Sequence, residues 1–348
     1  MRHALVLAGG SGTRLWPYST KAVPKQLVPL FDGKSLLQIA LDRAAAVTSL
    51  VWLGTGSALE DACADVEGLD PTRLVIEPSG RDTLPALTLG MARIAAMDPS
   101  AVVAVLTSDH LIEPIGAFAA TVERGFHVAE AHDDALVTFG VVPDHPSTGF
   151  GYLELGEELS GDALIVSRFA EKPQAERAAQ LVASGALWNS GMFVWQAATF
   201  LRAVEAFAPE TLARVTAYLA GDLAQWDELA KVSVDFGIME PASTSSDFTV
   251  AAVPMTARWL DVGSWPQYGD ALVRTPEGNA VGAGSSVLID SHECLVASSD
   301  PSHLVALVGC EGLVVVHTPN ATLVMPAAEA QRVKELHAAV LAQFPDLA

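Results

Sequence analysis

The feature that most constrains the fold is the regular alternation of short apolar runs with segments of helical periodicity. The apolar runs lie at 3–8, 50–53, 74–76, 102–106 and 136–139. Between them, segments such as 36–47 and 84–97 place apolar residues three and four positions apart, which is the spacing of an amphipathic helix. Strands that alternate with helices are joined by right-handed crossovers, and these build a mainly parallel sheet. We therefore predict an α/β fold with a Rossmann-like, mainly parallel mixed sheet flanked by helices.

The pattern changes after about residue 143. The later candidates are strands of an inserted β-rich region at 152–155 and 164–169, helices at 174–184 and 197–220, and a strand at 248–254. The stretch 279–325 is strand-like with glycine-rich turns, and an amphipathic helix is expected at 327–342. A chain of 348 residues has room for two domains. We predict a catalytic domain over 1–275 and a small C-terminal β-rich domain over 276–348.

The charge balance excludes several kinds of partner. The chain has 41 acidic and 20 basic residues, for a net charge of −21, so its surface repels nucleic acid and anionic membranes. No apolar run approaches the roughly 18 residues of a membrane span. Three distant cysteines indicate neither a disulfide framework nor a zinc site, and so favour a reduced, cytoplasmic location. A phosphate substrate would need basic side chains concentrated locally.

A glycine-rich loop follows the first predicted strand directly. Its candidate nucleotide-binding residues are Leu7, Ala8, Gly9, Gly10, Ser11, Gly12 and Thr13. Glycines allow backbone N–H groups to approach phosphate oxygens, and the guanidinium of Arg14 can donate two hydrogen bonds to a phosphate. Lys25 follows on a proline-stiffened stretch, and 14–25 holds three cations and no acid. This is the local positive charge that a phosphate site requires, although a glycine-rich turn with solvated lysines is the plainer alternative.

Two better-known phosphate loops are excluded. A Walker A loop needs Lys followed by Ser or Thr after its last glycine, and this loop has no such pair. A dinucleotide fingerprint needs a third glycine, and Leu15 stands at that position. The sequence therefore argues against a P-loop kinase.

Seven segments in order carry a family resemblance. They are GGSGTRL at 9–15 with Pro24-Lys25, EPSGRDTLPA at 77–86, SDH at 108–110, TGFGY at 148–152, FAEKP at 169–173, WNSGMF at 188–193 and WLDVGSW at 259–265. Together they resemble the sugar-1-phosphate nucleotidyltransferases, in the mannose-1-phosphate guanylyltransferase branch. The resemblance implies a glycosyltransferase-A-like nucleotidyltransferase fold. It also implies that GMP is transferred from GTP to α-D-mannose 1-phosphate by Mg²⁺-assisted in-line attack, which gives GDP-mannose and pyrophosphate.

The resemblance assigns roles to individual residues. Asp109 and Asp261 would be the Mg²⁺ ligands, and Asp109 follows a strand, where open α/β sheets bind ligands. Asp109 would also contact the nucleotide and Asp261 the sugar phosphate. Lys172 would meet the sugar phosphate and act with Arg14 and Lys25 in catalysis. The rest of the sugar pocket would be Glu171, Asn189 and the backbone of Gly149. His110 is expected to be structural, because this chemistry needs no base.

The segment after the predicted strand 74–76 is the candidate for base recognition. Its residues are Glu77, Ser79, Gly80, Arg81 and Asp82, with Arg81 a candidate for the triphosphate as well. The family usually has Asn where this chain has Asp82, which leaves the choice of base open.

Two other functions remain open. One is another nucleotide-sugar pyrophosphorylase, which would join glucose 1-phosphate to UTP or dTTP, and the other is a non-catalytic nucleotide-sugar sensor. The segment 276–348 could form a homodimer contact or a lid.

Overall fold

The computed structural model describes residues 1–10, 12–21, 23–60, 63, 66, 69–344 and 347. The chain divides into two compact units, each made of several segments. The first unit comprises Met1–Gly9, Leu41–Thr107 and Ile112–Arg258, and the second comprises Gly10–Ala40, Ser108–Leu111 and Trp259–Ala348. The predicted division at residue 275 stays a prediction, because the compact units follow a different partition of the chain. Among the described residues, no helix combines the length and the apolar character that crossing a membrane requires.

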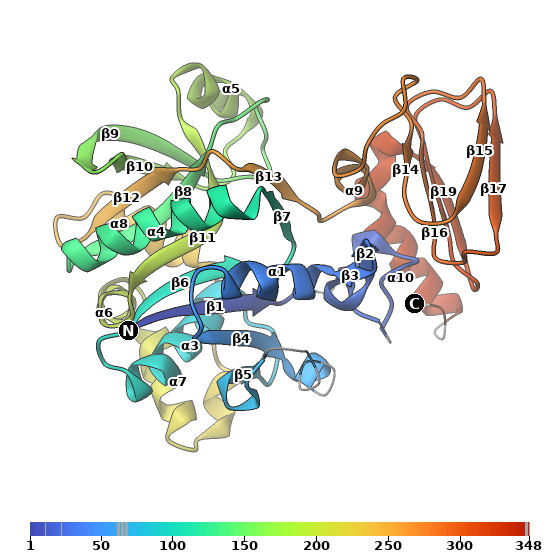
Figure 1. Ribbon diagram of the computed structural model, residues 1–348. Helices are drawn as coiled ribbons and strands as arrows, with labels where there is room; N and C mark the ends of the chain where they lie inside the picture. The colour runs from blue at the N-terminus through green and yellow to red at the C-terminus, as the bar shows by residue number, and fades with distance from the viewer. Residues whose placement is uncertain are drawn as a thin grey trace. The chain divides into compact units, whose positions relative to one another are not determined.

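The first unit is built on one nine-stranded mixed sheet of order β5-β4-β1-β6-β11-β8-β12-β10-β9 (Figure 1). The strands are β1 (Arg2–Ala8), β4 (Val51–Gly56), β5 (Leu74–Glu77), β6 (Val102–Thr107), β8 (Ala135–Val141), β9 (Tyr152–Ser160), β10 (Ala163–Ala170), β11 (Leu187–Gln196) and β12 (Thr249–Pro254). Strand β1 pairs in parallel with β4 and β6, and β12 with β8. The fold class predicted from the apolar runs is therefore confirmed.

Two details of this sheet differ from the prediction. Strands β9 and β10 extend the main sheet at one edge, because β10 pairs with β12, and they do not form a separate insertion. Strand β11 runs antiparallel between β6 and β8 and was not predicted. Its polar stretch Asn189-Ser190-Gly191 hides the strand periodicity, whereas the pairing with both neighbours imposes the extended conformation.

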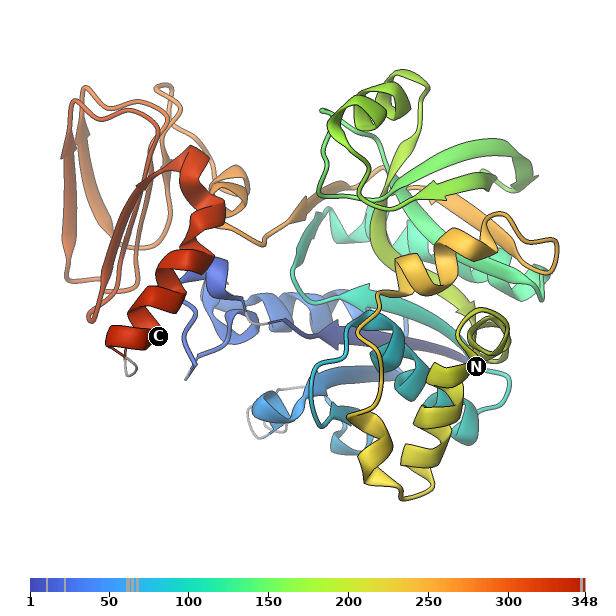
Figure 2. The same cartoon turned by 180° about the vertical axis from the view of Figure 1, so that it is seen from behind.

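The helices of the first unit cover both faces of the sheet. They are α3 (Thr83–Met97), α4 (Ile115–Ala131), α5 (Ala175–Ala183), α6 (Ala197–Phe207), α7 (Pro209–Leu219) and the short α8 (Glu240–Ala242), and α1 (Leu36–Ala45) links the two units in sequence. Helix α4 packs on β8 and β11, and α3 packs against α6 and α7 (Figure 2). The single helix predicted at 197–220 is two helices, because Pro209 lacks a backbone N–H and starts a new helix.

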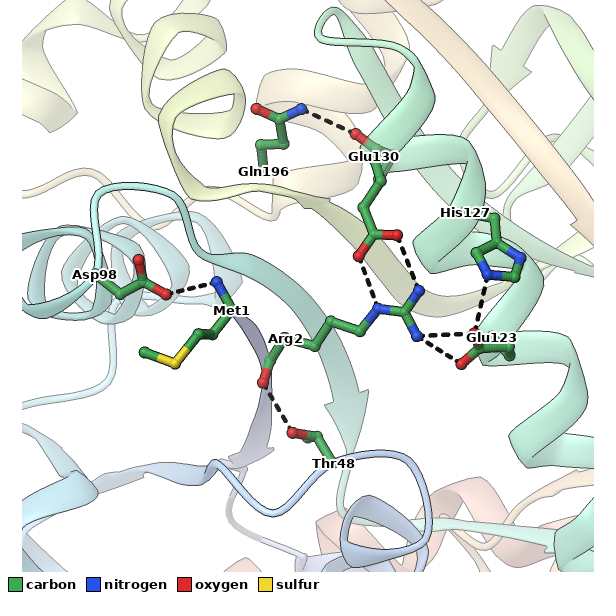
Figure 3. Close-up of polar contacts among 9 residues, drawn as sticks. Met1, Arg2, Thr48, Asp98, Glu123, His127, Glu130 and Gln196 are labelled. Carbon is green, nitrogen blue, oxygen red and sulfur yellow. Dashed lines mark hydrogen bonds and ion pairs between the residues drawn. The ribbon is translucent and has the colours of Figure 1, made fainter.

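The start of β1 is fixed by ion pairs (Figure 3). The Arg2 guanidinium donates to Glu123 and Glu130 of α4, each at 2.7 Å at the closest. The amino group of Met1 donates to Asp98 at 2.8 Å. These contacts join the first strand to α4 and to the turn after α3.

The second unit contains a β-helix-like stack. Its strands are β14 (Ala280–Val281), β15 (Ser285–Ile289), β16 (Leu295–Ser298), β17 (Leu304–Val308), β18 (Leu313–His317) and β19 (Thr322–Pro326), followed by α10 (Val333–Gln343). Strands β14, β16 and β18 pair in parallel, as do β15 and β17, and β19 is antiparallel to β18 (Figure 1, brown to red). The predicted C-terminal β-rich domain is therefore present.

The second unit also includes a segment from the N-terminal part of the chain. This segment has the short strands β2 (Pro29–Phe31) and β3 (Lys34–Ser35), and it is joined by the strand pair β7 (His110–Glu113) and β13 (Arg258–Asp261) and by α9 (Trp265–Asp270). Leu15 and Trp16 share one apolar cluster with Trp265, Val316 and Val333. The glycine-rich loop therefore rests on a core that the C-terminal strands complete.

Candidate active site

The glycine-rich loop leaves β1 through left-handed backbone conformations. Gly10 and Gly12 have φ of 98° and 58°, which favour glycine. A Cβ at Gly12 would also lie 2.5 Å from the Cβ of Lys25, so a side chain there would collide. The Ser19 hydroxyl donates to the Gly12 carbonyl at 2.7 Å and closes the loop. Ser11, a predicted phosphate-binding residue, lies outside the described residues.

The residues on either side of these glycines belong to β1 and to a short 3₁₀ turn. Leu7 and Ala8 are the last residues of β1, and the Ala8 carbonyl accepts a hydrogen bond from Thr55. Thr13 begins a short 3₁₀ turn that carries the exposed Arg14. The loop thus turns sharply after the strand, as the glycine pattern predicts, and Gly9 stands where the strand ends.

Lys25 lies close to one of the two predicted metal ligands. Its Nζ donates to Asp109 Oδ2 at 2.7 Å, and the lysine is only 8% exposed. Burial of Asp109 acts to raise the pKa of its carboxyl, but the positive charge of Lys25 outweighs it and holds that pKa at about 2. Asp109 is therefore an anion at neutral pH.

Asp261 completes a pair of carboxylates. One side-chain oxygen from each of Asp109 and Asp261 lies within 4.8 Å of the other and of a His110 ring nitrogen. Burial first, and then the negative charge of Asp109, raise the pKa of Asp261 to about 6. The N–H of Val262 donates to the Asp109 carbonyl at 2.9 Å, which holds β13 against β7 at this point. Two carboxylates at one point attract a divalent cation.

His110 is poorly suited to be a third ligand. The indole N–H of Trp259 donates to Nδ1 of His110 at 3.1 Å, and the two rings meet edge to face. A neutral imidazole that accepts at Nδ1 carries its proton on Nε2, which leaves no lone pair for a metal. Oxygen ligands suit a hard cation such as Mg²⁺, so the two carboxylates fit that ion.

A second cluster lies in the first unit, around Glu171 and Lys172. Lys172 Nζ lies 2.7 Å from Glu171 Oε1, and the backbone of Lys172 has a φ of 41°. Burial acts to lower the pKa of Lys172, but the hydrogen bond to Glu171 and nearby acids raise it. A Cβ at Gly151 would lie 2.7 Å from Glu171 Oε2, so the glycine leaves room for that carboxylate.

Asn189 connects this cluster to an acid that sequence reasoning missed. The Thr138 hydroxyl donates to Asn189 Oδ1 at 2.7 Å, and Asn189 Nδ2 donates to Asp235 Oδ1 at 2.8 Å. Burial first, and then the charge of Glu171, raise the pKa of Asp235 to about 7. Asp235 opens a π-helical turn, a feature that often marks functional sites. No motif pointed to it in the sequence.

Gly149 lies in the turn that precedes β9. Its N–H donates to the Ser147 hydroxyl at 3.1 Å. The backbone contact to Asn189 comes instead from Gly151, whose carbonyl accepts from the Asn189 N–H at 2.8 Å. The sugar-binding role of Gly149 stays a prediction.

The predicted base-recognition segment follows β5. Glu77 is buried, and its burial is the main cause that raises its pKa to about 7. Arg81 donates to Asp227 at 2.8 Å, and the Ser79 carbonyl accepts from the Trp226 indole at 2.8 Å. The segment is thus held by polar contacts to the turn that follows α7.

The two remaining candidates in this segment differ in their surroundings. Asp82 has a φ of 70° and its carboxylate accepts from the Thr83 N–H, so it caps α3. Gly80 has no heavy atom within 4 Å of where a Cβ would be. A base could therefore approach the backbone at Gly80.

The fold and the clustered carboxylates, lysine and glycine-rich loop define a nucleotidyl transferase. The family described as "Nucleotidyl transferase" matches residues 3–277, and a "MannoseP isomerase/GMP-like beta-helix domain" matches residues 284–338. The chain belongs to the mannose-1-phosphate guanylyltransferase branch of this enzyme family, as the motifs indicated.

Several relatives share most of the chain. The "Putative mannose-1-phosphate guanylyltransferase" of Vibrio cholerae is 32% identical over 95% of this chain and 73% of its own length. ManC of Salmonella typhimurium, a mannose-1-phosphate guanylyltransferase, is 35% identical over 96% of this chain and 72% of its own. A Thermus thermophilus structure titled "mannose-1-phosphate geranyltransferase" superposes with a TM-score of 0.88 at 32% identity, covering 97% of this chain and 99% of that one.

Proposed function

We propose that the chain transfers GMP from GTP to α-D-mannose 1-phosphate, giving GDP-mannose and pyrophosphate with Mg²⁺ as the metal. The observation that carries the proposal is the group of Lys25, Asp109 and Asp261 beside the glycine-rich loop. Lys25 supplies positive charge, and Asp109 and Asp261 supply a candidate cation site, in a chain with a net charge of −21. The names of the relatives support the choice of sugar and base.

The chemistry needs positioning and charge neutralisation more than a side-chain nucleophile. The attacking group is a phosphate oxygen of the sugar phosphate, which is already an anion, and pyrophosphate leaves from the α-phosphorus. Asp109 and Asp261 would hold Mg²⁺, which when bound neutralises charge on phosphate oxygens. Arg14, Lys25 and the N–H groups of the loop would bind the triphosphate.

The first-unit cluster suits a sugar phosphate. Glu171 and Asp235 offer carboxylate oxygens to sugar hydroxyls. The amide of Asn189, which donates to Asp235, adds a further polar group. Lys172, whose side chain is 60% exposed, would meet the phosphate. In the same unit, Ser79, Gly80 and Arg81 remain the candidates for the base, with Glu77 and Asp82 beside them.

Location and assembly are part of the same proposal. Cys63, Cys294 and Cys310 are all free thiols, which fits a reducing cytoplasm. A homodimer through 276–348 remains a proposal, as does the division into 1–275 and 276–348. No nucleic-acid or membrane partner is proposed.

A substrate panel tests the activity directly. Pyrophosphate release is measured with GTP, UTP, dTTP or ATP against mannose 1-phosphate or glucose 1-phosphate, with Mg²⁺ and with EDTA. We expect the highest kcat/KM for GTP with mannose 1-phosphate, and no release with EDTA. A preference for UTP or dTTP with glucose 1-phosphate would select the other pyrophosphorylase. Tight GDP-mannose binding without turnover of any pair would select a sensor.

A further inference from the structure

The second unit contains a cavity that the proposed chemistry does not use. Its volume is about 630 Å³, within the range of small-molecule sites. One wall comes from residues between Pro17 and Pro29 and from Gly33 in the β2–β3 turn, and the other comes from successive turns of the β-helix. The cavity therefore joins the base of the glycine-rich loop to the C-terminal strands within one compact unit.

The two walls differ in chemistry. The N-terminal wall is mainly apolar and includes Pro17, Val23 and Val28. On the β-helix wall, the exposed Ser299 and Asn320 offer a hydroxyl and an amide, whereas the hydroxyls of Ser298 and Thr318 bond to the backbone within their own turns. None of the described lining residues is charged, in a chain whose net charge is −21. A ligand with one apolar face and several hydroxyls, but without charge, matches both walls.

The lining also contains polar groups that a ligand could satisfy. The Tyr18 hydroxyl is buried out of reach of the cavity, so Tyr18 contributes its ring to the apolar wall. The Thr20 hydroxyl accepts from the Val23 N–H at 3.2 Å, which leaves its own proton available to a ligand oxygen. Gly284 lets the opposite wall pack closely, because a Cβ there would lie 2.6 Å from the Cβ of Ser298.

The cavity wall is joined to the glycine-rich loop through the chain itself and through one hydrogen bond. Ser19 stands between the lining residues Tyr18 and Thr20, and its hydroxyl holds the Gly12 carbonyl at 2.7 Å. Val23, another lining residue, precedes Lys25 by two positions. A ligand that orders this wall would also restrict the loop.

We propose that this cavity binds a neutral sugar ring, free or at the end of a glycoside, and that its occupation alters the affinity of the glycine-rich loop for the nucleotide. A pyranose presents C–H groups on one face and hydroxyls at its edge, which is the pattern of the two walls. The binding part stands on the cavity alone, whereas the effect on the nucleotide rests on the proposed function.

The test uses maltose and methyl α-D-mannopyranoside as neutral probes in saturation-transfer NMR titrations. Ala283 lines the cavity and is exposed, so Ala283→Trp fills it. Ala306, an exposed residue of β17 outside the lining, supplies the matched control Ala306→Trp. Both probes are also titrated into Asn189→Ala, which removes the sugar pocket of the first unit. If Ala283→Trp does not fold, Ser299→Trp replaces it.

We expect saturable binding to the wild type, Asn189→Ala and Ala306→Trp, and at least tenfold weaker binding to Ala283→Trp. No saturable binding of either probe, or equal binding to Ala283→Trp, would overturn the site. In calorimetric titrations, saturating maltose should change the Kd for GTP at least threefold in the wild type and not in Ala283→Trp. An unchanged Kd would overturn the coupling. The sugar titration involves no nucleotide, so it decides the site even if the proposed function fails.

Discussion

At the scale of single residues, charge decides what each unit can bind. In the second unit, buried Lys25 lies against Asp109, and the burial of Asp261 beside that anion raises its pKa. In the first unit, Asp235 is held near Glu171 and titrates far above an ordinary aspartate. These carboxylates are kept together against their repulsion, which is costly unless a cation or hydroxyl donors are bound there.

Lys25→Ala should lower kcat/KM by the equivalent of about 3–4 kcal/mol, the scale of losing one preorganised electrostatic donor. The matched control is Lys21→Ala, since Lys21 is an exposed lysine of the same segment and should retain near-normal kinetics. Initial rates of pyrophosphate release measure both. If Lys25→Ala keeps wild-type kcat/KM while folded, the lysine does not meet the nucleotide.

Asp261→Asn should weaken Mg²⁺ binding by at least tenfold, because one of two anionic ligands is replaced by a neutral amide. Calorimetric titration of Mg²⁺ measures this without turnover. Asp290→Asn, an exposed acid of the β-helix turns, is the control. An unchanged Mg²⁺ titration for Asp261→Asn would remove Asp261 from the metal site.

The stability of Asp235→Asn should depend on pH in a defined direction. The carboxyl titrates near 3.8 when unfolded and at about 7 when folded, so the folded state binds the extra proton between these values. The contribution of Asp235 to the free energy of unfolding of the wild type therefore falls as the pH rises through that window. Relative to the wild type, Asp235→Asn should gain about 4 kcal/mol in the free energy of unfolding at pH 8 compared with pH 4. Urea unfolding at both pH values measures the difference, and equal differences would contradict the burial of this acid.

At the scale of elements, most of the candidate residues lie in loops that follow strands, whereas Asn189 and Asp261 lie on strands themselves. The glycine-rich loop follows β1, Asp109 follows β6, and the base-recognition segment follows β5. Strand β11 places Asn189 beside Thr138 of β8, which fixes the amide before any ligand arrives. The regular elements are therefore the rigid support for an irregular set of ligand-binding loops.

Gly12→Ala should destabilise the chain by about 1–3 kcal/mol, the cost of a non-glycine residue at a left-handed position. It should also raise the KM for GTP, because the new methyl group displaces Lys25. Gly9→Ala is the comparison, since a Cβ at Gly9 meets no atom within 4 Å. Thermal unfolding and GTP kinetics of both variants measure the effect, and identical behaviour would show that the loop tolerates a side chain at Gly12.

At the scale of the whole molecule, the N-terminal loop and the C-terminal strands depend on one apolar cluster. Leu15, Trp16, Leu30 and Leu36 share this cluster with Trp265 and with residues of β14, β16, β18 and β19. The residues of this cluster come from both sides of position 275, and all of them lie in the second unit. The β-helix strands are thus part of the support for the glycine-rich loop.

Truncation after residue 275 should therefore leave the glycine-rich loop without its core. Each buried large side chain lost from a core costs about 2–5 kcal/mol, and the set lost here exceeds the 5–15 kcal/mol of a typical domain. We expect loss of the near-ultraviolet circular dichroism from Trp16 and Trp265, and loss of GTP binding. A truncated chain that keeps both would show that residues 1–275 fold alone.

The local chemistry of this protein could be predicted from the sequence. Apolar runs mark β1, β4, β5, β6 and β8 because a strand needs only a few adjacent residues to show its pattern. The glycine-rich loop and the acids that follow strands are visible for the same reason, since each is a short contiguous motif. The structure brings together Lys25, Asp109 and Asp261, as the metal-pair hypothesis requires.

Tertiary structure alone decided the contacts that join distant segments. No sequence motif marks Asp235. It becomes part of a cluster only because folding places it against Asn189, which is 46 residues away in the sequence. The antiparallel insertion of β11 and the sharing of one core by residues 15–36 and 262–333 are of the same kind. Such contacts depend on which surfaces must be buried together, and burial is a property of the folded chain that no local periodicity encodes.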